Sequence, residues 1–243
     1  MTDRERDNRR RLRLSQVIAL LLLPAALLAL SALYVVAVVI QGRPFLFASE
    51  RMRTPDQAFR LYKIRTMHPP EAEVGEMVLC ARQARRVTPL GAVLRRARLD
   101  ELPQIFNVLK GDIGFIGPRP PLRRYVEAYP DLYAEVLRGT LPGITGLATV
   151  MLHRREEALL AACRDPAEAD SVYRARCIPI KARLDLIYSR NRGFRLNAMI
   201  LFRTVSRLSL RSRDTHSPTI SSAEPDVQPN GFRTPVRMLR EAA

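Results

Sequence analysis

Residues 17–40 read VIALLLLPAALLALSALYVVAVVI, a run of 24 residues without a charged side chain. As a helix, this run is about 36 Å long at roughly 1.5 Å per residue, which is enough to span a bilayer core of about 30 Å. The apolar part of a cleaved signal peptide, which is the alternative, is usually only about 7–15 residues long. The run therefore predicts a helix that remains in the membrane.

The charges on both sides of this run predict its topology. Six arginines lie between residues 4 and 13, and five arginines and one lysine lie between residues 43 and 65, each set outnumbering the acids beside it. Basic flanks stay on the cytoplasmic side, so a simple span leaves one flank on the wrong side. Pro24 removes a helical hydrogen bond and bends the helix. These features fit two topologies equally well: a re-entrant helix-break-helix hairpin with both ends cytoplasmic, and a single tilted span with a proline kink.

The composition places the rest of the chain in a globular class. The 243 residues are 47% hydrophobic and 26% charged, which excludes a wholly disordered, collagen-like or multi-pass membrane chain. Three widely spaced cysteines exclude a disulfide scaffold and a zinc motif. The net charge of +16 indicates an anionic partner, which could be a membrane surface, a phosphorylated substrate or nucleic acid.

We predict a mainly α fold with a short β element, organised in four parts. A basic cytoplasmic N-terminus (1–16) precedes the membrane segment (17–40), a compact cytoplasmic domain with amphipathic surface helices (41–211) and a disordered tail (212–243), which is rich in Ser, Thr, Pro and Asp.

The hydrophobic patterns predict individual elements within the compact domain. Residues 59–65 alternate as in a strand, and apolar residues recur at helical spacing over 90–97, with arginines off that face. Asp100 reads as the N-cap of a second short helix that ends at Gly111. The pair Pro142-Gly143 predicts a turn. Further predictions are a loop and helix over 68–81, a strand over 113–116, and helices over 122–138, 155–164, 168–190 and 195–210.

An acidic pair beside a cationic block is the first candidate for chemistry. Residues 82–98 contain six arginines and no acid, and Asp100-Glu101 follows directly. Neighbouring guanidiniums favour the ionised carboxylate and also bind phosphates. Such a carboxylate can hold a divalent cation together with substrate phosphates, or attack phosphorus as a nucleophile. A helix cap with surface salt bridges is the alternative.

Three further basic residues are candidates for binding an anion. Arg119 lies between Pro118 and Pro120, whose fixed backbone angles preorganise it. Lys63 and Arg65 share one face of the predicted strand, where a solvated surface is the alternative. The sequence contains no Ser/His/Asp set, P-loop or dinucleotide-binding motif.

Residues 94–120, LRRARLDELPQIFNVLKGDIGFIGPRP, closely resemble the signature of the bacterial sugar transferases, which are monotopic polyprenyl-phosphate phosphoglycosyl transferases. Further pieces match in order: FRLYKIRTM at 59–67, RVTPLG at 86–91, LPGITGL at 141–147, DLIY at 185–188 and AMILFRT at 198–204. The resemblance covers about residues 15–208.

The resemblance implies an activity and a place. Such enzymes move a sugar 1-phosphate from a UDP-sugar to a polyprenyl (undecaprenyl) phosphate and release UMP, as the first membrane step of exopolysaccharide, O-antigen or glycoconjugate assembly. They work through a covalent Asp-phosphosugar, with Mg²⁺, on the cytoplasmic face of the bacterial inner membrane. The family also has a re-entrant membrane hairpin.

The resemblance also implies roles for individual residues. Asp100 matches the family's nucleophile and magnesium ligand, and Glu101 matches its dyad partner. The positions that match substrate phosphate-binding groups are Arg119, Arg95, Lys63 and Arg65.

Four positions depart from the family pattern and leave the nucleotide contacts and the sugar open. Leu23 replaces the serine before the break proline, Thr149 replaces a glutamine, Asn197 replaces an acid, and residues 53–57 replace a glycine-rich turn.

The expected partners are a UDP-sugar, a polyprenyl phosphate lipid and the inner membrane, with a homodimer or downstream glycosyltransferases as further candidates. We expect the minimal form of the family, without an added multi-span region. Two alternatives are a membrane-tethered basic nucleic-acid-binding protein and a non-catalytic scaffold. The sequence has no recognised nucleic-acid motif and no Trp, so we expect no nucleic-acid partner.

Overall fold

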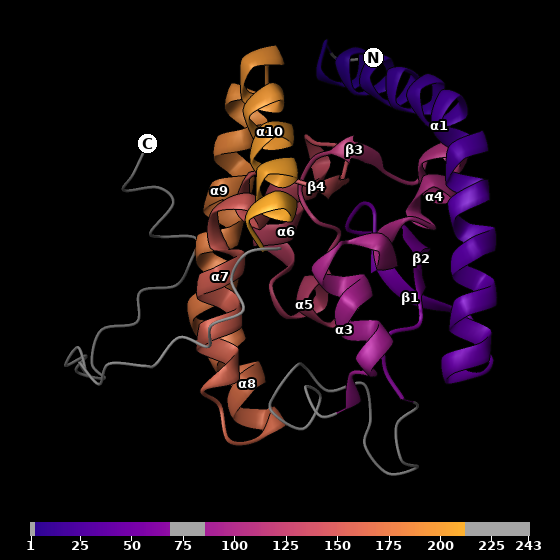
Figure 1. Ribbon diagram of the computed structural model, residues 1–243. Coiled ribbons are helices and arrows are strands. Elements are labelled where there is room, and N and C mark those ends of the chain that lie inside the picture. Colours follow the sequence, from indigo (N-terminus) through magenta and orange to yellow (C-terminus); the bar gives the residue numbers. More distant parts are fainter. Residues whose placement is uncertain (1–2, 69–85, 212–243) are drawn as a thin grey trace.

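The computed structural model describes residues 3–68 and 86–211 (Figure 1). This part of the chain is mainly helical and contains two short two-stranded sheets, which confirms the predicted fold class at this level. Most of the predicted loop and helix at 68–81 and the whole predicted tail at 212–243 lie outside the described residues.

Helix α1 (Asp3–Gln41) includes both the apolar run and most of the basic residues before it. Figure 1 shows two straight stretches that meet at a bend, and Pro24 lies inside the helix, where its missing N–H interrupts the hydrogen bonding. One face packs on the rest of the chain through Ala19, Ala26, Leu30 and Ala37. The remaining faces expose many large apolar side chains, and α1 is the one helix among the described residues that is long and apolar enough to cross a membrane.

The predicted strand at 59–65 is confirmed as β2 (Ala58–Ile64), which pairs antiparallel with β1 (Leu46–Met52). Leu61 and Ile64 are both buried, and because they are three residues apart they lie on opposite faces of the strand and join separate core clusters. Phe47 lies opposite Lys63 in the register, so their side chains share one face of the hairpin.

Helix α3 (Pro89–Arg96) confirms the predicted basic amphipathic helix, and the Thr88 side chain caps it by accepting a hydrogen bond from Gly91 N at 2.8 Å. The next prediction, that Asp100 is an N-cap, is wrong. Residues 99–101 form a 3₁₀ turn, η1 (Leu99–Glu101), and α4 (Gln104–Lys110) begins only after Pro103. Proline has no N–H, so it cannot continue the hydrogen bonding from the turn into the helix. Gly111, with a φ of 84°, ends α4 as predicted.

Strand β3 (Gly114–Ile116) confirms the predicted strand at 113–116, but it pairs in parallel with β4 (Gly143–Thr145), where the sequence predicts only a turn. Glycines permit this pairing. A Cβ on Gly117 would lie 2.1 Å from the Leu141 carbonyl oxygen, and one on Gly143 would lie 2.2 Å from Gly117 N. The close contact fixes the loop that carries Arg119.

Most of the remaining helices lie on the side of the molecule opposite α1 (Figure 1). The predicted helix over 122–138 is divided at Pro130 into α5 (Arg123–Ala128) and α6 (Pro130–Arg138). The others are α7 (Leu147–Ala161), α8 (Pro166–Val172), the π-helical turn η2 (Tyr173–Cys177), α9 (Ile178–Asn191) and α10 (Phe194–Arg211). A core that includes Val126, Val136, Ile178 and Leu186 joins α5 and α6 to α9.

Candidate active site

Glu101 is the centre of a cluster of ion pairs. Its Oε1 atom accepts from Arg119 at 2.9 Å and from Lys63 at 3.3 Å, and its Oε2 atom lies 3.1 Å from Arg98 Nη1. The carboxylate is only 8% exposed, while each of the three cations keeps about a quarter of its side chain accessible. A buried carboxylate therefore holds three cations together, and each of these cationic side chains remains partly accessible to solvent.

Asp100 lies beside this cluster but is not tied into it. Asp100 is 7% exposed, and within the part of the chain that the structure describes its carboxylate has no hydrogen-bond or ion-pair partner. Lys63, Arg95 and Arg119 act on it electrostatically. Its oxygens are therefore available for a ligand in a cationic surrounding.

The backbone turn before the dyad brings a third cation, Arg98, to Glu101. Arg98 has a φ of 58°, in the left-handed region, and this turn of the chain starts η1 immediately after α3. The i,i+3 spacing in the tight turn brings Arg98 back onto Glu101. The sequence did not single out Arg98 as a member of the site. Arg98 itself adopts the left-handed conformation, and because it is not a glycine, the sequence gives no sign of this turn.

Arg95 and Asn107 hold the neighbouring elements in place. Arg95 Nε donates to Thr66 Oγ1 at 2.8 Å, which ties α3 to the end of β2. Asn107, with no exposed surface, accepts from Tyr62 N at 3.0 Å and donates to the carbonyl oxygen of Arg60 at 2.7 Å, so α4 is bound to β2. Sequence reasoning missed Asn107, whose position inside an apolar helix face is its only local signal.

Arg65 does not join the cluster, although the sequence predicts it among the phosphate-binding residues. Its Nη2 atom donates to the carbonyl oxygens of Gln41 at 2.5 Å and Gly42 at 2.7 Å, at the C-terminal end of α1. A cation there satisfies free carbonyls and complements the negative end of the helix dipole. The structure thus brings together Asp100, Glu101, Arg119, Arg95 and Lys63, and it places Arg65 at a helix end.

The pKa shifts of the two carboxylates have opposite signs. Burial raises the pKa of Asp100, and the nearby Glu101 adds to this, while Lys63, Arg95 and Arg119 oppose it. Burial also acts to raise the pKa of Glu101, but the attraction of Arg119, Lys63 and Arg98 outweighs it and holds the pKa far below its usual range. Glu101 is therefore the permanent anion that keeps the cations in place.

The cations respond to the same environment. Burial, together with repulsion from Arg119, lowers the pKa of Lys63 to about 8. The attraction of Glu101 raises the pKa of Arg119, which stays charged. Lys63 is consequently the member of the cluster whose charge changes near neutral pH.

A divalent cation fits Asp100 better than Glu101. Among the described residues, no group of three or more acidic, histidine or cysteine side chains forms a complete metal site. Magnesium characteristically takes only one or two carboxylates and completes its shell with water and substrate phosphates. Both oxygens of Glu101 are bound by cations, whereas those of Asp100 have no cation bound among the described residues, so Asp100 is the carboxylate that could bind a divalent cation.

Comparison with known proteins gives a family and several relatives. Residues 9–211 match the family model described as bacterial sugar transferase. The chain is 34% identical over 174 residues to a UDP-N-acetylgalactosamine-undecaprenyl-phosphate N-acetylgalactosaminephosphotransferase of Aeromonas hydrophila, covering 67% of this chain and 34% of that protein. It is 36% identical over 143 residues to a UDP-glucose:undecaprenyl-phosphate glucose-1-phosphate transferase of Caulobacter vibrioides, covering 58% and 53%.

A third relative extends over more of the chain. It is an undecaprenyl-phosphate glucose phosphotransferase of Komagataeibacter xylinus, 32% identical over 201 residues, covering 80% of this chain and 34% of that protein. The matched regions therefore span about a third to a half of the length of these relatives. Because the family match includes the dyad, the cationic cluster and the parallel strand pair, this chain belongs to the bacterial sugar transferase family.

Proposed function

We propose that this protein is a phosphoglycosyl transferase that moves a sugar 1-phosphate from a UDP-sugar to a polyprenyl phosphate, undecaprenyl phosphate in particular, and releases UMP. The observation that carries the proposal is the difference between the two carboxylates of the dyad: Glu101 binds three cations, whereas Asp100 has no hydrogen-bond or ion-pair partner within residues 3–68 and 86–211. The names of the three relatives all refer to undecaprenyl phosphate, one with N-acetylgalactosamine and two with glucose.

The chemistry follows from the charges. Arg119, Lys63 and Arg95 bind the oxygens of the substrate diphosphate and offset the repulsion between it and the Asp100 carboxylate. A carboxylate oxygen of Asp100 then forms a bond to the phosphorus next to the sugar, and the bond from that phosphorus to the bridging oxygen breaks, so UMP leaves with the bonding electrons. A bound Mg²⁺ would add positive charge at the phosphates, with Asp100 as its protein ligand.

The second half of the reaction regenerates the enzyme. An oxygen of the polyprenyl phosphate attacks the phosphorus of the Asp100 acyl phosphate, the bond to Asp100 breaks, and the sugar diphospholipid forms. Because both halves pass through the same phosphorus, the same cations stabilise the charge in each transition state. We expect ping-pong kinetics.

The acceptor is a lipid, and α1 is the element that would bring the site to the bilayer. Both ends of α1 contact the same folded body: Asp7 pairs with Arg192 at 3.2 Å, and Gln41 Nε2 donates to Arg65 O at 2.9 Å. A helix that crosses the bilayer has its ends on opposite sides, so these contacts favour re-entrant attachment to the cytoplasmic face. The exposed apolar side chains of α1 would then lie in the lipid.

Cysteine labelling tests this topology. In a chain whose three native cysteines are replaced by alanine, Asp3→Cys and Ala48→Cys should both react only from the cytoplasmic side. Reaction of the two sites from opposite sides would exclude the re-entrant arrangement.

The activity is tested by measuring UMP release from a panel of UDP-sugars, with purified protein, polyprenyl phosphate and Mg²⁺. We expect one or a few UDP-sugars to yield UMP together with an equal amount of sugar-linked lipid. Absence of both products from every UDP-sugar, in protein that is folded, would refute the assignment. In a competition assay, an added oligonucleotide should not inhibit UMP release from the UDP-sugar. Strong inhibition of UMP release would favour nucleic-acid binding.

A further inference from the structure

The hairpin of β1 and β2 places an exposed phenylalanine beside the cationic cluster. Phe47 of β1 is the register partner of Lys63 in β2. Opposite residues of an antiparallel pair project from the same face, with their Cβ atoms about 5 Å apart. Lys63 Nζ lies 3.3 Å from Glu101 Oε1, so this face of the hairpin borders the site. Phe47 is 51% exposed, and the site therefore has an apolar side chain at its edge that a ligand can reach.

The same strand leads back to α1. Phe45, two residues before Phe47, packs edge-to-face on Tyr34 of α1, with ring centroids 5.3 Å apart and an interplanar angle of 85°. The carbonyl oxygen of Phe45 accepts from Arg65 N at 2.8 Å, directly after the end of β2. Leu46, between the two phenylalanines, is also exposed. Apolar side chains therefore continue from α1 along the start of β1 to the edge of the cluster.

The end of α1 that the hairpin contacts is itself apolar on its outer side. Its last two turns expose four aliphatic side chains, those of Val35, Val36, Val39 and Ile40. They belong to the run that the proposed function places in the lipid. The hairpin thus has an apolar, bilayer-facing element at one end and phosphate-binding cations at the other. A polyprenyl phosphate has the same polarity, because it carries an anionic phosphate on an apolar isoprenoid chain.

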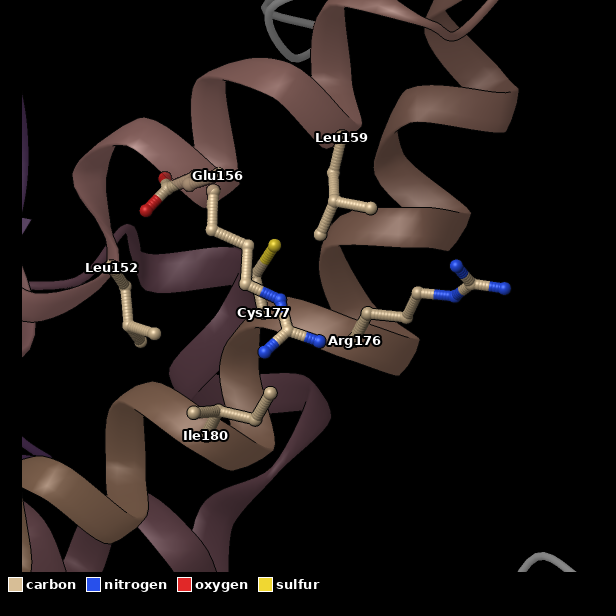
Figure 2. A pocket seen from close by; sticks show the side chains of 7 residues that line it. Leu152, Glu156, Leu159, Arg176, Cys177 and Ile180 are labelled. Atoms are coloured by element: carbon tan, nitrogen blue, oxygen red, sulfur yellow. The ribbon is translucent and has the colours of Figure 1, made fainter. Parts of the chain in front are cut away.

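The shallow depression between α7 and α9 is a poorer place for this chain. It is lined in part by four apolar side chains, those of Leu152, Leu159, Cys177 and Ile180 (Figure 2). These helices lie on the side of the molecule opposite α1 (Figure 1). The hairpin, by contrast, contacts α1 through the pair of Tyr34 and Phe45, and it contacts Glu101 through Lys63.

We propose that Phe47 contacts the isoprene unit next to the phosphate of the lipid acceptor, and that the hairpin guides the isoprenoid chain from the bilayer to the cations. The phosphate binds at the cluster by charge complementarity, and the chain extends over Phe47 toward α1. This rests on the proposed function and deepens it, because Phe47 acts on the acceptor and not on the UDP-sugar. Phe47 is then a specificity-determining residue for the second substrate.

The test measures the two substrates separately. In a ping-pong reaction, kcat/KM for the UDP-sugar reports the first half-reaction and kcat/KM for the acceptor reports the second. We expect Phe47→Ala to lower kcat/KM for undecaprenyl phosphate about tenfold or more, and to leave kcat/KM for the UDP-sugar within about twofold of the wild type. Phe47→Leu keeps an apolar side chain at this position and should restore most of the activity with the acceptor. Thermal unfolding verifies that the variants are folded.

A control variant separates this contact from general binding to membranes. Phe202 of α10 is an exposed phenylalanine outside the hairpin, and Phe202→Ala should keep both kcat/KM values within about twofold of the wild type. Flotation with vesicles of phosphatidylethanolamine and phosphatidylglycerol, without acceptor, measures membrane binding directly. Phe47→Ala and the wild type should float to the same extent.

Three results overturn the inference. The first is a kcat/KM for undecaprenyl phosphate within about twofold of the wild type in folded Phe47→Ala. The second is an equal loss for both substrates, and the third is a loss that matches a loss of vesicle binding, which would make Phe47 a membrane anchor. Failure of the proposed function is a different outcome, in which the wild type itself releases no UMP.

Discussion

Arg119 Nη2 lies 2.9 Å from Glu101 Oε1 and makes no hydrogen bond to Asp100 among the contacts that the structure describes. Glu101 therefore binds the cations of the site, and the adjacent carboxylate stays available. Had Arg119, Lys63 and Arg98 paired with Asp100 instead, the proposed nucleophile would have had to break those ion pairs before it could react.

Replacing Glu101 tests whether it holds the cluster together. Glu101→Gln leaves three partly buried cations without their counter-ion, and loss of one partner of such a network costs about 3 kcal/mol. We expect a melting temperature lower by roughly 5–10 °C and a large loss of UMP release. Surface Glu50, which forms an exposed ion pair with Arg123, provides the control, and Glu50→Gln should change neither quantity measurably. An unchanged melting temperature in Glu101→Gln would show that the cations do not depend on it.

Arg65 and Arg119 should respond differently to the same substitution. Arg65→Ala removes two bonds to the end of α1, so we expect a stability loss of about 2 kcal/mol with a KM for the UDP-sugar close to that of the wild type. If Arg119 binds the substrate diphosphate as proposed, Arg119→Ala should raise KM and lower kcat by at least tenfold. Initial rates over a range of UDP-sugar concentrations distinguish the two. A large increase in the KM of Arg65→Ala for the UDP-sugar would indicate that Arg65 binds the substrate phosphates after all.

The pH dependence of the first half-reaction should report Lys63. Its pKa of about 8 means that it loses its proton, and with it the phosphate contact, as the pH rises through this value. We expect kcat/KM for UMP release to fall above pH 8, and Lys63→Arg to extend activity to higher pH. The raised pKa of Asp100 places the acidic limb above the usual range for an aspartate.

The alkaline loss of activity should not come from unfolding. The pKa of Lys63 is about 8 in the folded chain, whereas a lysine in the unfolded chain has its ordinary pKa of 10.5. Between these two pH values the unfolded chain therefore binds more protons than the folded chain. The contribution of Lys63 to folding stability therefore increases with pH across this window. A melting temperature measured at each pH separates the two causes, and a decline in activity that follows unfolding would contradict the assignment.

Asn107 should be essential for the position of the dyad. Asn107→Leu removes bonds to the backbone of Arg60 and Tyr62 and leaves a buried N–H unpaired, at about 1 kcal/mol for each bond and somewhat more for the unpaired group. We expect a stability loss of about 3 kcal/mol, measured by thermal unfolding, with reduced kcat in the folded fraction. Asn107→Asp keeps the acceptor for Tyr62 N, but it turns a buried carboxylate oxygen toward the Arg60 carbonyl and toward the Asp112 carboxylate, to which Asn107 Nδ2 donates at 2.9 Å, so we expect it to lose at least as much. A melting temperature of Asn107→Leu close to that of the wild type would show that these bonds do not hold α4 on β2.

Local patterns predicted the elements whose causes are local. The alternation at 59–65 predicted β2, the helical spacing at 90–97 predicted α3, and Gly111 predicted the end of α4. The pattern over 122–138 predicts one helix, but Pro130 has no N–H to continue the hydrogen bonding and divides it into α5 and α6.

Features that depend on distant contacts could not be predicted in this way. The pairing of β3 with β4 depends on glycines in two segments that meet only in the folded chain, and Pro142-Gly143 alone predicts a turn. Arg65 directly follows the end of β2, and its hydrogen-bond partners lie at the end of α1, which no local pattern near Arg65 indicates. Asp100 and Glu101 were adjacent candidates, and only the ion pairs distinguish their roles.

The most direct test of the covalent mechanism is the mass of the intact protein after mixing with Mg²⁺ and the UDP-sugar that it uses, without a lipid acceptor. The wild type should gain the mass of one sugar phosphate, release one equivalent of UMP, and carry the adduct on the peptide that contains Asp100. Asp100→Asn should show neither adduct nor UMP. If the wild type turns over with the lipid but forms no adduct and releases no UMP without it, or if Asp100→Asn turns over normally, Asp100 is not the nucleophile.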